Sequence, residues 1–89
     1  MRFPVHNMEK VIIYSTPACV YCGMAKKFFA AHDITFEEHD VSVDLAARAE
    51  MEKKSGQLGV PVIEIGEHIF VGFDRGALER MVGVERKIK

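Results

Sequence analysis

Two cysteines separated by two residues constrain this chain more than any other feature of its sequence. Cys19 and Cys22 follow the apolar residues 11–14 and the turn-forming residues 15–18. A helical pattern begins directly after them, so we expect both thiols on the first turn of a helix that follows a strand. Residues three apart on a helix have Cα atoms about 5 Å apart, within the roughly 4.4 to 6.8 Å that a disulfide requires. The spacing therefore predicts a reversible, redox-active dithiol.

The place of the pair on the helix predicts a different role for each cysteine. The free amides and partial positive charge of a helix N-terminus favour the thiolate of the first cysteine, and the thiolate is the nucleophile. Cys19 is therefore expected to attack a substrate disulfide. Cys22 is expected to resolve the mixed disulfide that forms.

A zinc site and a structural disulfide are the alternatives to redox chemistry. A structural zinc site needs four ligands, usually from a second Cys pair or from a closely spaced His pair, and the chain has neither. Its four histidines are scattered: His6, His32, His39 and His68. A disulfide that closes so short a loop removes little entropy from the unfolded chain, so it would add little stability. We expect no metal ligands and favour redox chemistry.

Length and composition indicate one small globular domain. The chain has 89 residues, of which 48% are hydrophobic, enough for a single core. We expect the domain at residues 9–83, with terminal extensions at 1–8 and 84–89. The net charge of −1, without a polybasic segment, argues against nucleic-acid and membrane-surface partners. No segment resembles a signal peptide or a bilayer span, so we expect a cytoplasmic protein, and we expect it to be a monomer.

Strands and helices alternate in the first half of the chain. Residues 10–14 read as a buried strand, and residues 21–32 read as a helix. The apolar residues of this helix are Met24, Ala25, Phe28 and Phe29. Residues 33–38 contain Ile34 and Phe36 in alternation with polar residues, which predicts a half-buried strand at or near a sheet edge.

The second half of the chain predicts a helix, a hairpin and a final helix. Ser42 or Asp44 can cap a helix that Gly56 ends. Its expected core residues are Leu45, Ala46, Ala49 and Met51. Residues 60–65 and 68–71 read as an antiparallel hairpin, and Asp74 precedes a helix over residues 75–82 that Gly83 ends. The expected inward residues of this last helix are Ala77, Leu78 and Met81.

The predicted order βαβαββα belongs to the α/β class. Two parallel strands joined by a helix, followed by a hairpin, give a mixed four-stranded sheet flanked by three helices. Together with the Cys-x-x-Cys helix and Gly59-Val60-Pro61 before the hairpin, this order resembles the thioredoxin-like fold of the glutaredoxin family. The resemblance covers residues 10–82. It implies a cis peptide bond at Pro61 and a Val60 main chain that pairs with the incoming substrate.

Two branches of that family share features with this chain. Glutathione-using members are similar at positions that imply a substrate site: Tyr21, Gln57, Val60, Pro61, Gly72 and Asp74. Glutaredoxin-like donors to ribonucleotide reductase, which are recharged by thioredoxin reductase, are similar at Pro17-Ala18-Cys19-Val20 and at Gly72-Phe73. Tyr21 is expected either to contact substrate or to be a half-exposed aromatic residue of the first turn. Asp74 is expected as a helix N-cap or as a ligand of the substrate.

The departures from the glutathione-using pattern predict weak glutathione binding. Thr16 stands where those members have a lysine, which removes a cation that could bind a carboxylate of glutathione. Gly59 stands for a threonine, and Phe73 puts bulk where a tripeptide main chain would lie. Val20 stands for a proline and restores a backbone N–H near Cys19.

We therefore predict a thiol–disulfide oxidoreductase: a small dithiol electron carrier that reduces protein or low-molecular disulfides. No dinucleotide fingerprint is present, so the electrons come from another thiol or protein. The expected reductant is thioredoxin reductase or glutathione, with glutathione as a co-substrate and no tightly bound cofactor. The alternative implied by the resemblance is an iron–sulfur protein, in which Cys19 of each of two protomers and glutathione hold a cluster.

Overall fold

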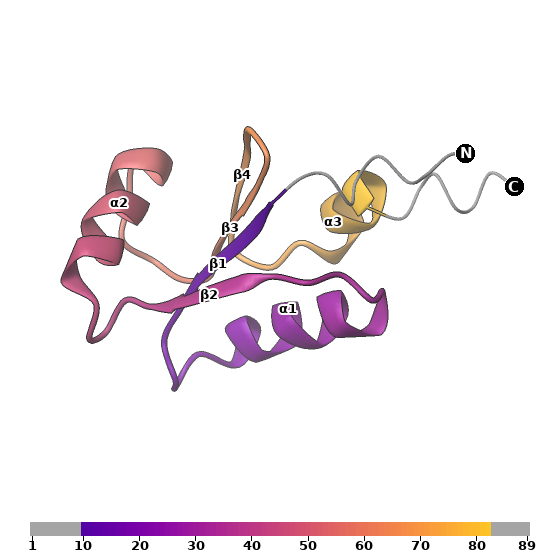
Figure 1. The fold of residues 1–89 in the computed structure, drawn as a ribbon, viewed down its shortest axis with the longest axis horizontal. Coiled ribbons are helices and arrows are strands. Elements are labelled where there is room, and N and C mark those ends of the chain that lie inside the picture. Colours follow the sequence, from indigo (N-terminus) through magenta and orange to yellow (C-terminus); the bar gives the residue numbers. More distant parts are fainter. Residues whose placement is uncertain (1–9, 83–89) are drawn as a thin grey trace, which may run out of the picture.

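The structure is a computed structural model, and it describes residues 10–82. These residues form four strands and three helices. In chain order they are β1 (Val11–Ser15), α1 (Val20–Ala31), β2 (Glu37–Asp40), α2 (Leu45–Ser55), β3 (Val62–Ile65), β4 (His68–Val71) and α3 (Arg75–Val82) (Figure 1). The predicted order βαβαββα is confirmed. The predicted extensions at residues 1–8 and 84–89, and the predicted helix stop at Gly83, lie outside the described residues.

The sheet is mixed, and its strands lie in the order β2-β1-β3-β4. β1 pairs with β2 in parallel, and α1 is the crossover between them. β3 is antiparallel to β1 and to β4, so β3 and β4 form the predicted hairpin. The parallel pair places the carboxyl ends of β1 and β2 at one edge of the sheet, which is where α1 begins.

The helices cover both faces of the sheet, because alternate residues of β1 point to opposite sides. Val11 and Ile13 belong to a core that α1 and α3 complete with Phe28, Phe29 and Leu78. Tyr14 belongs to a second core that α2 completes with Ala47 and Met51. Figure 1 shows α2 well separated from α1 and α3.

The prediction for β2 was correct in kind and wrong in its bounds. We expected residues 33–38, whereas the strand is Glu37–Asp40. Asp33 has a left-handed backbone (φ 58°) that completes the turn after α1, so strand pairing starts later. Ile34 and Phe36 are partly buried against the first core but precede the paired residues. The strand itself is short and polar, as suits a sheet edge.

The prediction for the buried face of α2 was wrong except at Met51. Ala47 and Met51, four residues apart, are buried, whereas Leu45 is 68% exposed and Ala46 and Ala49 are also exposed. Asp44 rather than Ser42 caps the helix: its carboxylate accepts a hydrogen bond from the Ala47 N–H at 3.0 Å. This cap fixes the start of the helix and thereby turns the Ala47–Met51 stripe toward the sheet.

The remaining helix predictions are largely confirmed. Ala25, Phe28 and Phe29 of α1 are buried, but Met24 is 43% exposed. Leu78 of α3 is buried and Met81 packs on the first core, whereas Ala77 is half-buried. Gly56 ends α2 in the left-handed conformation that a helix C-terminus favours.

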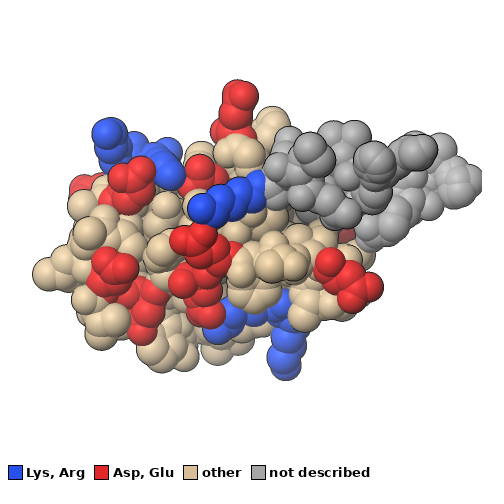
Figure 2. All heavy atoms as spheres, in the orientation of Figure 1, with Lys and Arg blue, Asp and Glu red and all other residues tan. Residues whose placement is uncertain are grey.

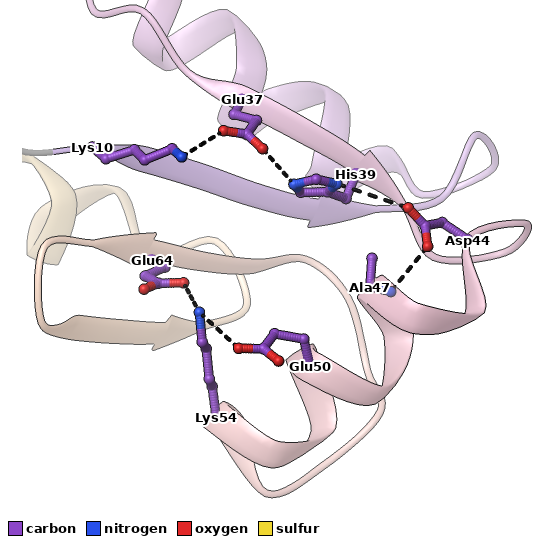
Figure 3. Close-up of polar contacts among 8 residues, drawn as sticks. All are labelled: Lys10, Glu37, His39, Asp44, Ala47, Glu50, Lys54 and Glu64. Atoms are coloured by element: carbon purple, nitrogen blue, oxygen red, sulfur yellow. Dashed lines mark hydrogen bonds and ion pairs between the residues drawn. The ribbon is translucent and has the colours of Figure 1, made fainter.

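Polar contacts join β2 to the residue before β1, and α2 to β3 (Figure 3). Glu37 pairs with Lys10 at 3.0 Å and with His39 Nε2 at 2.8 Å, and the His39 ring stacks on Tyr14. Lys54 of α2 pairs with Glu64 of β3 at 2.8 Å and with Glu50 at 3.3 Å. Figure 2 shows acidic and basic side chains interspersed over the visible face.

Candidate active site

The two cysteines lie at the N-terminus of α1, directly after the carboxyl end of β1. We call residues 16–22 the dithiol turn. Cys19 is the N-cap of α1, with extended backbone angles (φ −83°, ψ 116°), and its sulfur accepts a hydrogen bond from the Cys22 N–H at 3.1 Å. Helix N-caps normally use an oxygen for this bond, and a sulfur in the same place faces the free amides of the first turn. The expected placement of the dithiol is confirmed.

The two thiols differ in burial. Cys19 is half-buried, whereas Cys22 is 1% exposed and packs inside the protein. Burial, followed by the contact with the Cys19 sulfur, raises the pKa of the Cys22 thiol to about 12. Cys22 is therefore protonated and shielded at neutral pH, whereas a substrate can reach Cys19.

A cation lies near the buried thiol. Lys26, one helical turn after Cys22, pairs with Glu38 of β2 at 2.9 Å, and this contact raises the pKa of Lys26. The same carboxylate accepts a hydrogen bond from the buried Ser15 hydroxyl at 2.7 Å. Lys26 acts against the rise in the pKa of Cys22. In the sequence Lys26 reads as a solvated side chain, although its spacing of four residues from Cys22 places both residues on one helix face.

A second segment approaches Cys19 from the other side of the site. We call residues 57–61 the cis-proline loop, because the Val60–Pro61 peptide bond is cis, as the resemblance implied. The Cys19 thiol lies 3.8 Å from the Val60 carbonyl oxygen, which accepts its hydrogen. Pro61 is buried and Val60 is half-buried. The structure thus brings Cys19 and the Val60 main chain together.

Gln57 belongs to the same loop, but its side-chain amide contacts the chain itself. Its Oε1 accepts a hydrogen bond from the Gly59 N–H at 2.6 Å. Its Nε2 donates to the Gly59 carbonyl at 3.1 Å and to the Ser55 hydroxyl at 3.2 Å. We call this pair of bonds between Gln57 and Gly59 the amide clasp. The Gln57 side chain is therefore occupied within the loop that it belongs to.

The segment after β4 forms the third side of the site. Gly72 has a left-handed backbone (φ 84°), and its N–H donates to the Pro61 carbonyl at 2.8 Å, so it adjoins the cis-proline loop. The Phe73 ring packs edge-on against Phe28, with ring centroids 6.2 Å apart. The Asp74 carboxylate accepts from the Ala77 N–H at 3.1 Å, which makes it the N-cap of α3.

Exposed apolar side chains lie on the dithiol turn itself, and a groove follows along the adjoining helix. Tyr21 is 59% exposed and Val20 is 72% exposed, both on the first turn of α1. Further along α1, a groove of about 270 Å³ separates the helix from the start of α3. Its lining residues are Met24, Lys27, Phe28, Ala31, His32, Phe73 and Arg75.

Residues 10–82 contain neither a metal-ligand cluster nor a membrane-spanning helix. In that range no group of three or more His, Cys, Asp or Glu side chains is placed to hold a metal ion. No helix there is both long and apolar enough to cross a membrane.

Comparisons with known proteins agree on one family. A sequence model described as glutaredoxin matches residues 11–70. A glutaredoxin-like 8.6 kDa protein from the rubredoxin operon of Clostridium pasteurianum is 39% identical over 70 residues, which cover 79% of this chain and 93% of that protein. Glutaredoxin 3 of Escherichia coli is 35% identical over 83 residues, which cover 92% of this chain and 100% of that protein. The solved structure of the glutaredoxin-like NrdH-redoxin of Escherichia coli has a TM-score of 0.71 and 26% identity, covering 81% of this chain and 93% of that chain.

Proposed function

The chain belongs to the glutaredoxin family of thiol–disulfide oxidoreductases, with its thioredoxin-like fold, and from that premise we propose that it passes electrons from thioredoxin reductase to disulfides of protein substrates. The observation that carries this assignment is the difference in burial between the two thiols. Cys19 caps α1 within reach of a substrate, and Cys22 is buried behind it with its N–H on the Cys19 sulfur. Such a pair can attack a substrate disulfide and resolve the mixed disulfide without any other group, and it needs an external reductant only to be reset.

The reaction has two exchange steps. In the first, the Cys19 thiolate attacks one sulfur of a substrate disulfide; the substrate S–S bond breaks, a mixed disulfide forms, and one substrate thiolate leaves. In the second, the Cys22 thiolate attacks the Cys19 sulfur and releases the second substrate thiolate. The substrate gains two electrons and, with two protons from solvent and Cys22, becomes a dithiol. The carrier is left with a Cys19–Cys22 disulfide.

The second step needs a Cys22 thiolate, and the first step changes the surroundings of Cys22 so that this thiolate forms more readily. The Cys19 sulfur contributes to the raised pKa of Cys22 through its hydrogen bond and charge. In the mixed disulfide the Cys19 sulfur is neutral, so this contribution is lost and the pKa of Cys22 falls. Lys26 lowers the pKa of Cys22 further. The resolving thiol is therefore activated only after the first step.

The choice of thioredoxin reductase rests on the departures from the glutathione-using pattern. Thr16 offers no cation to a carboxylate of glutathione, and Phe73 occupies space with an aromatic ring. The NrdH-redoxin of Escherichia coli has a thioredoxin-like activity profile. A glutaredoxin-like NrdH protein of Lactococcus lactis is 30% identical over 74 residues. The thioredoxin-like profile of the Escherichia coli protein supports thioredoxin reductase as the reductant of this chain.

The protein works as a monomer in the cytoplasm, where reducing conditions keep a dithiol of this kind catalytic rather than structural. It holds no cofactor tightly. Glutathione is a slow co-substrate rather than the main source of electrons.

The test is to compare two reducing systems on the oxidised protein. NADPH with thioredoxin reductase should reduce it faster than NADPH with glutathione reductase and glutathione, at a matched supply of NADPH. Saturable, efficient reduction by glutathione with no response to thioredoxin reductase would contradict the proposed reductant. Anaerobic purification gives a further check, because a brown protein whose visible absorbance disappears in Cys19→Ser would indicate the iron–sulfur alternative.

A further inference from the structure

The amide clasp is a closed hydrogen-bonded unit next to the reactive sulfur. One side-chain amide, that of Gln57, uses its oxygen on the Gly59 N–H at 2.6 Å and its nitrogen on the Gly59 carbonyl at 3.1 Å. Both main-chain groups of one residue are therefore held by one side chain. The Ser55 hydroxyl, which also accepts from the Gln57 amide at 3.2 Å, ties the unit to the end of α2.

The clasp accounts for the glycine at position 59. The described glycines with left-handed backbones are Gly56, Gly66 and Gly72, so Gly59 is not needed for its backbone conformation. A Cβ atom at Gly59 would instead lie 2.7 Å from the Gln57 Oε1. That oxygen is at the end of a flexible side chain, so a larger residue would displace the amide rather than strain the backbone. The absence of a side chain at residue 59 is what lets the clasp close.

The clasp is one residue away from the atom that touches Cys19. The Val60 carbonyl oxygen, 3.8 Å from the Cys19 sulfur, directly follows Gly59 in the chain. On the other side of Val60, the Pro61 carbonyl accepts from the Gly72 N–H at 2.8 Å. The Val60 main chain is thus held from both directions, by Gln57 before it and by Gly72 after it.

We propose that Gln57 is a positioning residue, whose amide holds Gly59 and thereby sets where the Val60 main chain lies relative to Cys19. This inference rests on the proposed function only in that Cys19 is the attacking thiol and Val60 adjoins the substrate. Gln57 acts through Gly59 and Val60 and does not itself touch the reacting sulfur. Because the clasp bonds are largely exposed, they contribute little to global stability, so they can be broken in a folded protein.

Two substitutions open the clasp by independent routes. Gly59→Ala displaces the Gln57 amide with a methyl group, and Gln57→Leu removes the amide while keeping a side chain of similar size. The Val60 carbonyl accepts the hydrogen of the Cys19 thiol and so lies beside the reactive sulfur. Release of Val60 removes this contact and opens the sulfur, so the time profile of Cys19 alkylation by iodoacetamide at pH 7 should be about threefold faster in each variant. The kcat/KM for reduction of insulin should fall about fivefold to tenfold, because Val60 is no longer aligned.

The double variant Gly59→Ala/Gln57→Leu decides whether the two residues act as one unit. If they do, the double variant should show the same alkylation profile and the same kcat/KM as either single variant. Leu58→Ala is the matched control, since it removes an apolar side chain from the same loop without touching the amide; its alkylation profile should equal that of the unmodified protein. Circular dichroism at the assay temperature checks that every variant is folded.

An unchanged alkylation profile in both single variants, or additive effects in the double variant, would overturn the assignment of Gln57. Alkylation requires neither a reductase nor a protein substrate. The clasp can therefore be refuted while the proposed reductant stands, and the proposed reductant can be refuted while the clasp stands.

Discussion

The dithiol turn and the cis-proline loop face each other across the Cys19 sulfur, yet they consist of different kinds of group. The dithiol turn supplies reactive side chains at a helix N-terminus, where the Cys22 N–H meets the Cys19 sulfur at 3.1 Å. The cis-proline loop supplies main-chain atoms, of which the Val60 carbonyl is the one that reaches Cys19. The difference indicates a division of tasks: the turn carries out the exchange, and the loop aligns what is exchanged.

The largest expected effect comes from the dithiol turn. Cys19→Ser should abolish thiol exchange with insulin and with low-molecular disulfides, because the hydroxyl is not a nucleophile at neutral pH and Cys22 is buried. Gly59→Ala, the matched change in the loop, should slow the same reaction without abolishing it. Steady-state insulin reduction measures both. Residual activity of Cys19→Ser near that of Gly59→Ala would remove the distinction between the two segments.

The next comparison lies within the dithiol turn itself. Cys19 should be alkylated by iodoacetamide at pH 7 at least about a hundredfold faster than Cys22, because burial raises the pKa of Cys22 to about 12 and also blocks access. Mass spectrometry of peptides taken at successive times follows each cysteine separately. Equal rates, or faster modification of Cys22, would show that the roles of the two cysteines have been exchanged.

A smaller effect is expected from restoring features of the glutathione-using branch. Thr16→Lys combined with Phe73→Gly should raise the affinity for glutathione about tenfold to a hundredfold, since a charged contact to a partly desolvated carboxylate contributes about 1.5 to 3 kcal/mol. Titration with S-methylglutathione, which cannot exchange, measures affinity without chemistry.

Thr16→Lys alone is the control for that experiment, because Phe73→Gly also removes the ring contact with Phe28. Thr16→Lys alone should give the part of the gain in glutathione affinity that comes from the charged contact. If neither variant binds S-methylglutathione more tightly than the unmodified protein, then Thr16 and Phe73 are not what limits glutathione binding.

The smallest expected effect on the reaction comes from Ser55, whose hydroxyl links the cis-proline loop to α2. The Ser55 hydroxyl donates to the Met51 carbonyl at 2.7 Å and lies 2.9 Å from the Gln57 carbonyl, so it joins α2 to the loop. Ser55→Ala should lower the free energy of unfolding by about 1 kcal/mol in urea denaturation. The alkylation rate of Cys19 at pH 7 should stay within about twofold. A tenfold change in that rate would mean that the loop takes part in the chemistry as well as the alignment.

Much of this molecule could be predicted from its sequence because local signals agreed. The spacing of Cys19 and Cys22, the cap at Asp74 and the hairpin each depend on neighbouring residues, and each is confirmed. The start of β2 and the buried face of α2 depend on distant contacts. Leu45 reads as a core residue in the sequence. In the structure the sheet packs against Ala47 and Met51 instead, so Leu45 is exposed.

In the site, too, the features that depend on distant contacts could not be predicted from the sequence. Nothing in the sequence indicates that the Gln57 amide bonds to Gly59, because that contact depends on the path of the loop rather than on residue type. Lys26 reads as a solvated surface residue, and only the approach of Glu38 from β2 places its charge in a fixed position near Cys22. The chemistry of the site could therefore be predicted from the sequence, whereas the contacts that position and tune it could not.

The most direct test of the division between attack and alignment is to stop the reaction after its first step. Cys22→Ser leaves Cys19 able to attack but removes the only described thiol that could resolve the product. Incubated with a protein disulfide and no added glutathione, this variant should accumulate a stable mixed disulfide that mass spectrometry locates at Cys19. Turnover of Cys22→Ser at the rate of the unmodified protein, with no trapped species at Cys19, would contradict the dithiol mechanism.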